Sequence, residues 1–250
     1  MPFTLFHPAC VLPLRRLPRR WVSLSGLVAG SVAPDFEKFA KMRACNAYSH
    51  TWPSILYFTL PVGLALTFVF HLLVRDELTR QLPEPLRARL RRFGRFDWPR
   101  HFRRYYPAVV LSVLLGGLTH LLWDHFTHWK SPFATWFPFL QMGFTYGQLH
   151  FLGFDILNLL SSLAAAGYLL RQLRQLPPLP LHDHPARPAQ PAYWGLLAAV
   201  AGLIVAGKLL LLASPGSIWD QIITGFAALV FSLVLTSAWF KMRPLPSPRQ

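Results

Sequence analysis

Long apolar runs alternate with polar or proline-rich segments along the chain. A helix that crosses the hydrocarbon core of a bilayer needs about 20 consecutive apolar residues. The runs that are long enough cover residues 55–74, 107–126, 149–170, 193–213 and 219–240. A sixth run, residues 21–33, is too short to span, and we expect it to form a re-entrant or packing helix. The pattern predicts an all-α fold, a polytopic membrane helical bundle that forms one integral membrane domain over residues 1–250.

The composition supports this prediction. Hydrophobic residues make up 53% of the chain and charged residues only 14%, whereas soluble domains carry about 25% charged residues. The two cysteines, Cys10 and Cys45, are too few to define a disulfide framework or a thiolate metal site.

The charge of the chain bears on its orientation in the membrane. The net charge of +15 comes almost entirely from arginine, which is concentrated in the predicted loop 75–106. Basic clusters can bind nucleic acid. Juxtamembrane arginines, however, usually mark the cytoplasmic side of the membrane and attract anionic lipids. We therefore expect membrane lipids and no nucleic acid as partners. The loops on this side hold 16 Lys and Arg, against 8 on the other. The basic loop and the C-terminus are therefore predicted to be cytoplasmic.

The proline-rich linker 171–192 is expected to be extended and solvent-exposed.

Most of the unusual polar residues fall at one predicted membrane surface. They are His7 and Asp35 in the segment 1–53, His50 at the start of the first span, His120, Asp124 and His128 at the end of the second, His150 at the start of the third and Asp220 at the start of the fifth. Scattered core histidines would not be expected to converge in this way. Ionisable groups at membrane depth are costly and usually functional.

The stretch "THLLWDHFTHW", residues 119–129, carries the densest part of this pattern. On a helix, His120 and Asp124 are four residues apart and lie on one face, and His128 would lie about 80° around from His120. Imidazole nitrogen and carboxylate oxygen suit zinc or another divalent transition metal. A simple hydrogen-bonded His–Asp pair is the alternative. His125 points about 100° away from Asp124 and is expected to be an interfacial side chain.

The remaining candidates have simpler interpretations when each is taken alone. His7 precedes Pro8 and could be a loop histidine. Asp35 could be a favourable carboxylate in the first turn of a helix. His50 and His150 could be interfacial histidines at span ends.

Four sequence blocks carry a resemblance to a known family. "MPFTLFHPACVLPLRR", "SGLVAGSVAPDFEKF", "YSHTWP" and "LLGGLTHLLWDHFTHW" resemble, in this order, the blocks of a bacterial membrane family known as domain of unknown function 4184. The pattern is also similar to the YdjM-type putative membrane-bound metal-dependent hydrolases. It is more remotely similar to the helical fold of zinc-dependent phospholipase C.

The resemblance implies a set of metal ligands. These are His7, Asp35, His50, His120 and Asp124, followed by His128 and His150. Asp124 and Asp35 could each bridge two ions. The soluble zinc enzymes have a later HxxxE motif, but Phe154 stands at that offset from His150. The resemblance therefore implies one or two ions rather than a complete trinuclear site.

Two functions from different classes follow from these observations. The first is a metal-dependent hydrolase in the bacterial inner membrane that uses a divalent metal, most simply zinc, on a phosphoester or lipid-linked substrate, with Asp35 or Asp124 orienting the attacking water. The second is a non-catalytic membrane protein that transports an ion, a proton or a small molecule, or acts as a scaffold. In the second case Asp155, Asn158, Lys208 and Asp220 would matter more than His7 and His50.

Overall fold

The computed structural model describes residues 4–18, 20–94, 96–128, 133–147, 149–179, 190–211 and 216–243. Within these ranges, five helices are long and apolar enough to cross a membrane. They cover Ile55–Gln81, Trp98–Thr127, Gly153–Arg174, Pro191–Leu211 and Ile218–Met242. The predicted multi-pass, all-α membrane protein is thereby confirmed.

The basic segment 75–106 between the first two predicted spans is mostly helical. The segment forms α5 (Arg75–Gln81), α6 (Glu84–Leu90) and the first turns of α7 (Trp98–Thr127). Arginine, leucine and glutamate all have high helix propensity. In addition, Arg87 forms an ion pair with Glu84 one helical turn away, which stabilises a helix modestly.

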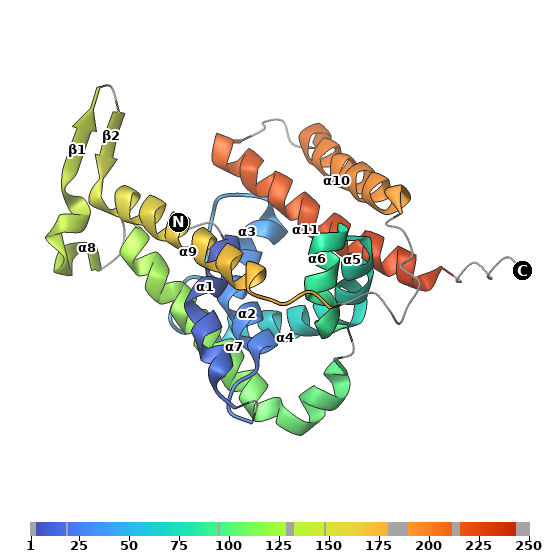
Figure 1. The fold of residues 1–250 in the computed structure, drawn as a ribbon. Helices are drawn as coiled ribbons and strands as arrows, with labels where there is room; N and C mark the ends of the chain where they lie inside the picture. Colours follow the sequence, from blue (N-terminus) through green and yellow to red (C-terminus); the bar gives the residue numbers. More distant parts are fainter. Residues whose placement is uncertain are drawn as a thin grey trace, which may run out of the picture. The chain divides into compact units, whose positions relative to one another are not determined.

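The third predicted span begins four residues later than expected. Residues 149–152 form β2 (Leu149–Leu152), which pairs antiparallel with β1 (Gly143–Tyr146), and α9 begins only at Gly153 (Gly153–Arg174). Gly147 has φ +60° in the turn of this hairpin, a conformation that favours glycine. Two short elements, α8 (Phe133–Trp136) and the 3₁₀ helix η7 (Pro138–Gln141), precede the hairpin. Figure 1 shows α8 and both strands at one end of α9.

The contacts between residues divide the chain into two compact units, where we had predicted one domain. Unit 1 comprises Met1–Phe36, Asn46–Thr67 and Pro99–Gln175. Unit 2 comprises Glu37–Cys45, Phe68–Trp98 and Leu176–Gln250.

Unit 1 is built around α7. Its N-terminal part folds into η1 (Thr4–Phe6), α1 (Pro8–Val11), η2 (Leu12–Arg16), α2 (Leu24–Val32) and η3 (Ala33–Asp35), and the first span enters it through η4 (Ile55–Thr59) and α4 (Leu60–Val69). The short apolar run is thus a packing helix, α2, which lies beside α7 in Figure 1.

Glycines let α2 and α7 approach backbone to backbone. A Cβ atom on Gly30 would lie 2.1 Å from the Val113 carbonyl oxygen, and one on Gly116 would lie 2.3 Å from that of Leu27. Small residues permit such close helix packing inside membranes, where apolar burial gives little driving force. This close contact sets the position of α2 along the axis of α7. It therefore also sets the position of the polar residues that follow α2.

Unit 2 contains α3 (Phe36–Lys41), η5 (Phe70–Val74), α5, α6, α10 (Pro191–Leu211) and α11 (Ile218–Met242). Helices α10 and α11 pack against each other, as Figure 1 shows, and Tyr193 Oη lies 2.8 Å from Ser237 Oγ across this contact. The proline-rich linker falls largely on residues 180–189, outside the described residues.

Candidate metal centre

Five polar side chains from four separate segments of unit 1 meet in one place. His7 caps the start of α1, Asp35 ends η3, His50 lies in the turn before η4, and His120 and Asp124 lie four residues apart near the end of α7. They form two overlapping groups of potential metal ligands, His7–Asp35–His120 and His50–His120–Asp124. In each group the candidate ligand atoms lie within 4.8 Å of one another.

Four of the donor atoms enclose a small space. His50 Nε2 lies 3.3 Å from His120 Nε2, 3.4 Å from Asp35 Oδ1 and 3.3 Å from Asp124 Oδ2. His120 Nε2 lies 3.9 Å from Asp35 Oδ1 and 3.6 Å from Asp124 Oδ2. Five of the six separations in this set of four atoms therefore fall between 3.3 and 3.9 Å.

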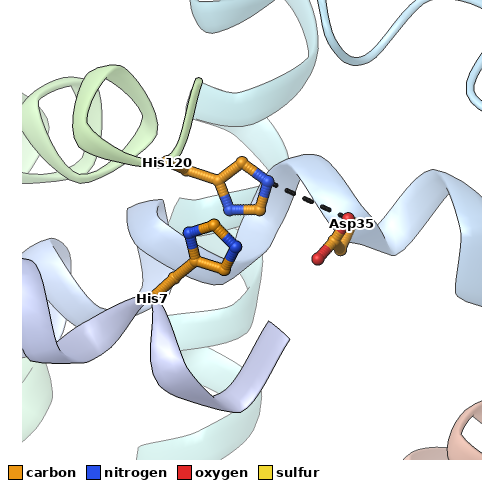
Figure 2. A group of neighbouring side chains, drawn as sticks. All are labelled: His7, Asp35 and His120. Carbon is orange, nitrogen blue, oxygen red and sulfur yellow. Dashed lines mark ion pairs between the residues drawn. The ribbon is translucent and has the colours of Figure 1, made fainter. Parts of the chain in front are cut away.

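His7 completes the cluster from the other side of His120. The two imidazole rings stack with centroids 3.8 Å apart and planes 18° apart, and Figure 2 shows them beside Asp35. His7 Nε2 lies 3.7 Å from Asp124 Oδ1, the oxygen that is not part of the four-atom set. The Asp124 carboxylate thus faces His7 with one oxygen and His50 and His120 with the other.

The cluster is largely removed from solvent. His7, Asp35, His120 and Asp124 are at most 4% exposed, and the His50 side chain is 15% exposed. Among the described residues, no donor reaches either Asp124 oxygen with hydrogen-bond geometry. A buried carboxylate normally has a hydrogen-bond partner, a counter-charge or a metal. Here the groups that face it are imidazole nitrogens, which carry positive charge only when they are protonated.

The outer atoms of three of these residues are held by neighbouring groups. His120 Nδ1 donates to the Ser31 carbonyl oxygen at 2.7 Å, His50 Nδ1 lies 2.8 Å from Ser49 Oγ, and Thr4 Oγ1 donates to Asp35 Oδ2 at 2.5 Å. Metal-binding histidines almost always use their second nitrogen in this way, which fixes the tautomer and the ring orientation. No local sequence pattern predicts these contacts.

These atoms fit a metal ion by distance as well as by chemistry. Two ligands about 2.1 Å from a zinc ion lie about 3.4 Å apart across a tetrahedral angle. The separations of 3.3–3.9 Å in the four-atom set are close to this value. Neutral imidazole with carboxylate is a donor set that suits zinc and other divalent transition metals. His7 Nε2 and Asp124 Oδ1 lie 3.7 Å apart and would be available to a second ion.

Sulfur is not among the donors. Cys10 lies in α1, three residues after His7, and belongs to neither ligand group. Desolvation raises the pKa of the Cys10 thiol, which disfavours the thiolate that binds metals.

All five cluster residues lie within residues 1–238, which match the model of the family described as Domain of unknown function (DUF4184). The chain belongs to the DUF4184 family. Neither a curated protein nor a solved structure matches it.

Two further ligand candidates of this DUF4184 protein lie outside both ligand groups. His128 follows the end of α7 at Thr127, so the helical geometry that would place it near His120 no longer applies. His150 is exposed in β2, and its Nδ1 lies 3.1 Å from Thr145 Oγ1 on the paired strand. His125 is likewise in neither ligand group, and its ring packs against Trp52 with centroids 4.9 Å apart.

The polar residues that would serve transport make structural contacts in this DUF4184 protein. Asp155 accepts a hydrogen bond from the Leu152 amide at 3.0 Å at the start of α9. Asp220 and Ser217 form a capping box at the start of α11. Lys208 Nζ donates to the Met42 carbonyl oxygen at 2.6 Å. Helix capping and loop fastening account for these three side chains.

Proposed function

We propose that this protein is a membrane-bound metal-dependent hydrolase whose metal site is the cluster of His7, Asp35, His50, His120 and Asp124. The observation that carries the proposal is the convergence of four segments on one buried set of nitrogen and oxygen atoms at ligand-like separations. The outer contacts of His120, His50 and Asp35 support it, because they point donor atoms inward.

The residues divide into two roles. His50, His120, Asp35 Oδ1 and Asp124 Oδ2 would hold one divalent cation, most simply zinc, and His7 with Asp124 Oδ1 would hold a second. A bound cation would polarise the scissile group and make a water molecule more acidic. Asp35 and Asp124 are the carboxylates of the cluster, and one of them would orient the attacking water.

The position of the cluster suggests where the substrate comes from. His50 precedes the first span, and Asp124 lies three residues before the end of the second, so the cluster would lie near a membrane surface. We therefore favour a phosphoester or lipid-linked substrate. His50 is the most exposed of the five residues. A substrate would therefore reach the cluster from the side of His50. The positive-inside rule favours an inner-membrane protein with a cytoplasmic C-terminus.

Metal content tests the proposal directly. The purified protein would be analysed by mass spectrometry for bound metals, beside His120→Ala, Asp124→Ala and the matched control His150→Ala. We expect stoichiometric zinc or another divalent metal in the wild type and in His150→Ala, and its loss in the other two variants. Loaded protein would then be assayed on phosphomonoesters, phosphodiesters and lipid-linked phosphates. Wild-type protein that neither retains nor takes up metal would overturn the proposal and favour a non-catalytic role.

A further inference from the structure

A second feature of unit 1 lies outside the metal cluster. Residues 133–152, here called the aromatic hairpin segment, contain α8, η7, β1 and β2. The segment joins α7 to α9, which are both long and apolar enough to span a membrane. Its sequence contains no Asp, Glu, Lys or Arg. A connection between two spans usually lies in water and is polar, so this composition needs an explanation.

The segment exposes large apolar side chains. Trp136 is 68% exposed, Met142 57% and Phe139 52%. The main exposed side chains of the segment are Trp136, Phe137, Phe139, Met142, Phe144 and Phe151. Soluble surfaces rarely gather so many apolar groups unless they contact a partner or a membrane.

The register of the hairpin places two aromatic rings on one face. Phe144 pairs with Phe151, and the next pair along the ladder is Thr145 with His150. Paired residues point to the same face of a sheet and successive residues to opposite faces. One face therefore carries the rings of Phe144 and Phe151. The other carries Leu152 beside a hydroxyl and an imidazole that lie 3.1 Å apart.

The exposure does not arise from a loosely attached loop. Leu140 is 1% exposed, and the Gly153 amide donates to the Met142 carbonyl oxygen at 3.0 Å. A Cβ atom on Gly153 would lie 2.1 Å from the Phe139 carbonyl oxygen, so the start of α9 packs tightly on η7. The exposed apolar side chains therefore belong to a segment that is packed against the start of α9.

We propose that the aromatic hairpin segment inserts into the interface of the lipid bilayer, between headgroups and acyl chains. Its attachment to the ends of two spans places it at a membrane surface. Among the described residues the sheet has two strands, so each strand has one edge outside the ladder, and the hydrocarbon core does not tolerate an open sheet edge. Tryptophan and other aromatic side chains favour the interface, where amphipathic elements lie about 5–10 Å deep. The partner is the lipid itself, and the inference does not depend on a bound metal.

Site-directed fluorescence tests the depth of the segment. Cys10 and Cys45 are the only two cysteines, so a Cys10→Ser/Cys45→Ser background accepts single new cysteines. Phe144→Cys and Trp136→Cys probe the apolar surface, Thr145→Cys is the matched control on the opposite face of the same strand, and Arg92→Cys is an exposed control outside the segment. Each variant is labelled with an environment-sensitive fluorophore and reconstituted in phosphatidylcholine–phosphatidylglycerol vesicles with nitroxide-labelled acyl chains.

We expect blue-shifted emission and strong nitroxide quenching at positions 144 and 136, weaker quenching at 145 and none at 92. The Trp136→Cys variant leaves the strands intact, so it remains informative if Phe144→Cys disturbs the hairpin. Water-like emission without quenching at both positions would overturn the proposal. Blue-shifted emission that nitroxide lipids do not quench would also overturn it, because the surface would then be covered by protein, for example a second copy.

Discussion

His120 donates a hydrogen bond from Nδ1 to the carbonyl oxygen of Ser31 at 2.7 Å. Because a carbonyl oxygen only accepts, this contact leaves the lone pair of the neutral imidazole on Nε2, which faces His50, Asp35 and Asp124. Helix α7, which supplies two of the five cluster residues, is thus connected through one side-chain-to-backbone hydrogen bond to α2, the helix that precedes Asp35.

Removal of metal is expected to destabilise the protein. A ligand that binds only the folded state at 100 times its dissociation constant stabilises that state by about 2.7 kcal/mol. Thermal unfolding in detergent, with and without a chelator, measures the effect as a drop in Tm that added zinc reverses. The His120→Ala variant should show no response to the chelator. Equal Tm values for treated and untreated wild-type protein would contradict the prediction.

Loss of the contact that orients Asp35 should weaken metal binding without abolishing it. Thr4→Val removes the hydroxyl that donates to Asp35 Oδ2. Substitution of such outer contacts typically lowers metal affinity by about 10–100-fold. Competition with a zinc indicator measures the affinity. Thr145→Val, which removes the hydroxyl beside His150, is the matched control and should bind as the wild type does.

The close approach of α2 and α7 should tolerate no added methyl group. In Gly30→Ala the new Cβ would meet the Val113 carbonyl oxygen at 2.1 Å, and overpacking of this kind typically costs about 1–3 kcal/mol or more. We expect a lower Tm together with reduced metal content. The reason is that Gly30 is followed by Ser31, whose carbonyl oxygen orients His120, and by the proposed ligand Asp35. In Gly167→Ala nothing lies within 4 Å of the new Cβ, and the better helix former should leave Tm unchanged or raise it. Similar behaviour of the two variants would refute the packing argument.

Helix capping, rather than transport, should explain the acidic residues at the starts of α9 and α11. Asp155→Ala and Asp220→Ala each remove a carboxylate that accepts a backbone hydrogen bond at the start of a helix, a contact that stabilises the helix N-terminus. We expect a small loss of thermal stability and unchanged metal content. Loss of an ion or proton flux in vesicles, at unchanged stability, would instead support the transport hypothesis.

Local spacing predicted part of the site, and longer-range contacts supplied the rest. The four-residue interval of His120 and Asp124 was enough to place both on one helix face. His7, Asp35 and His50 came from the family resemblance, because no local pattern distinguishes them from loop or capping residues. The Ser31 carbonyl could not be predicted, since every residue has one and only the packing of α2 on α7 selects it.

The errors in the predicted fold have similar causes. The apolar run that begins at residue 149 was assigned to a span because hydrophobicity alone does not separate a short strand from the first turn of a helix. The turn at Gly147 and the aromatic residues before it were the available signals. In the segment 75–106, charge density suggested a loop, whereas high helix propensity produced α5 and α6.

The separation of the cluster residues along the chain has a consequence for biogenesis. Ser31 and His120 are 89 residues apart, so the ribosome must synthesise most of α7 before the site can close. His7, Asp35 and His50 leave the ribosome first and cannot form the four-atom set by themselves. Under the proposed function, the complete set of metal ligands would therefore be available only after α7 has been synthesised. Retention of the ion would distinguish completely inserted chains from stalled or truncated ones.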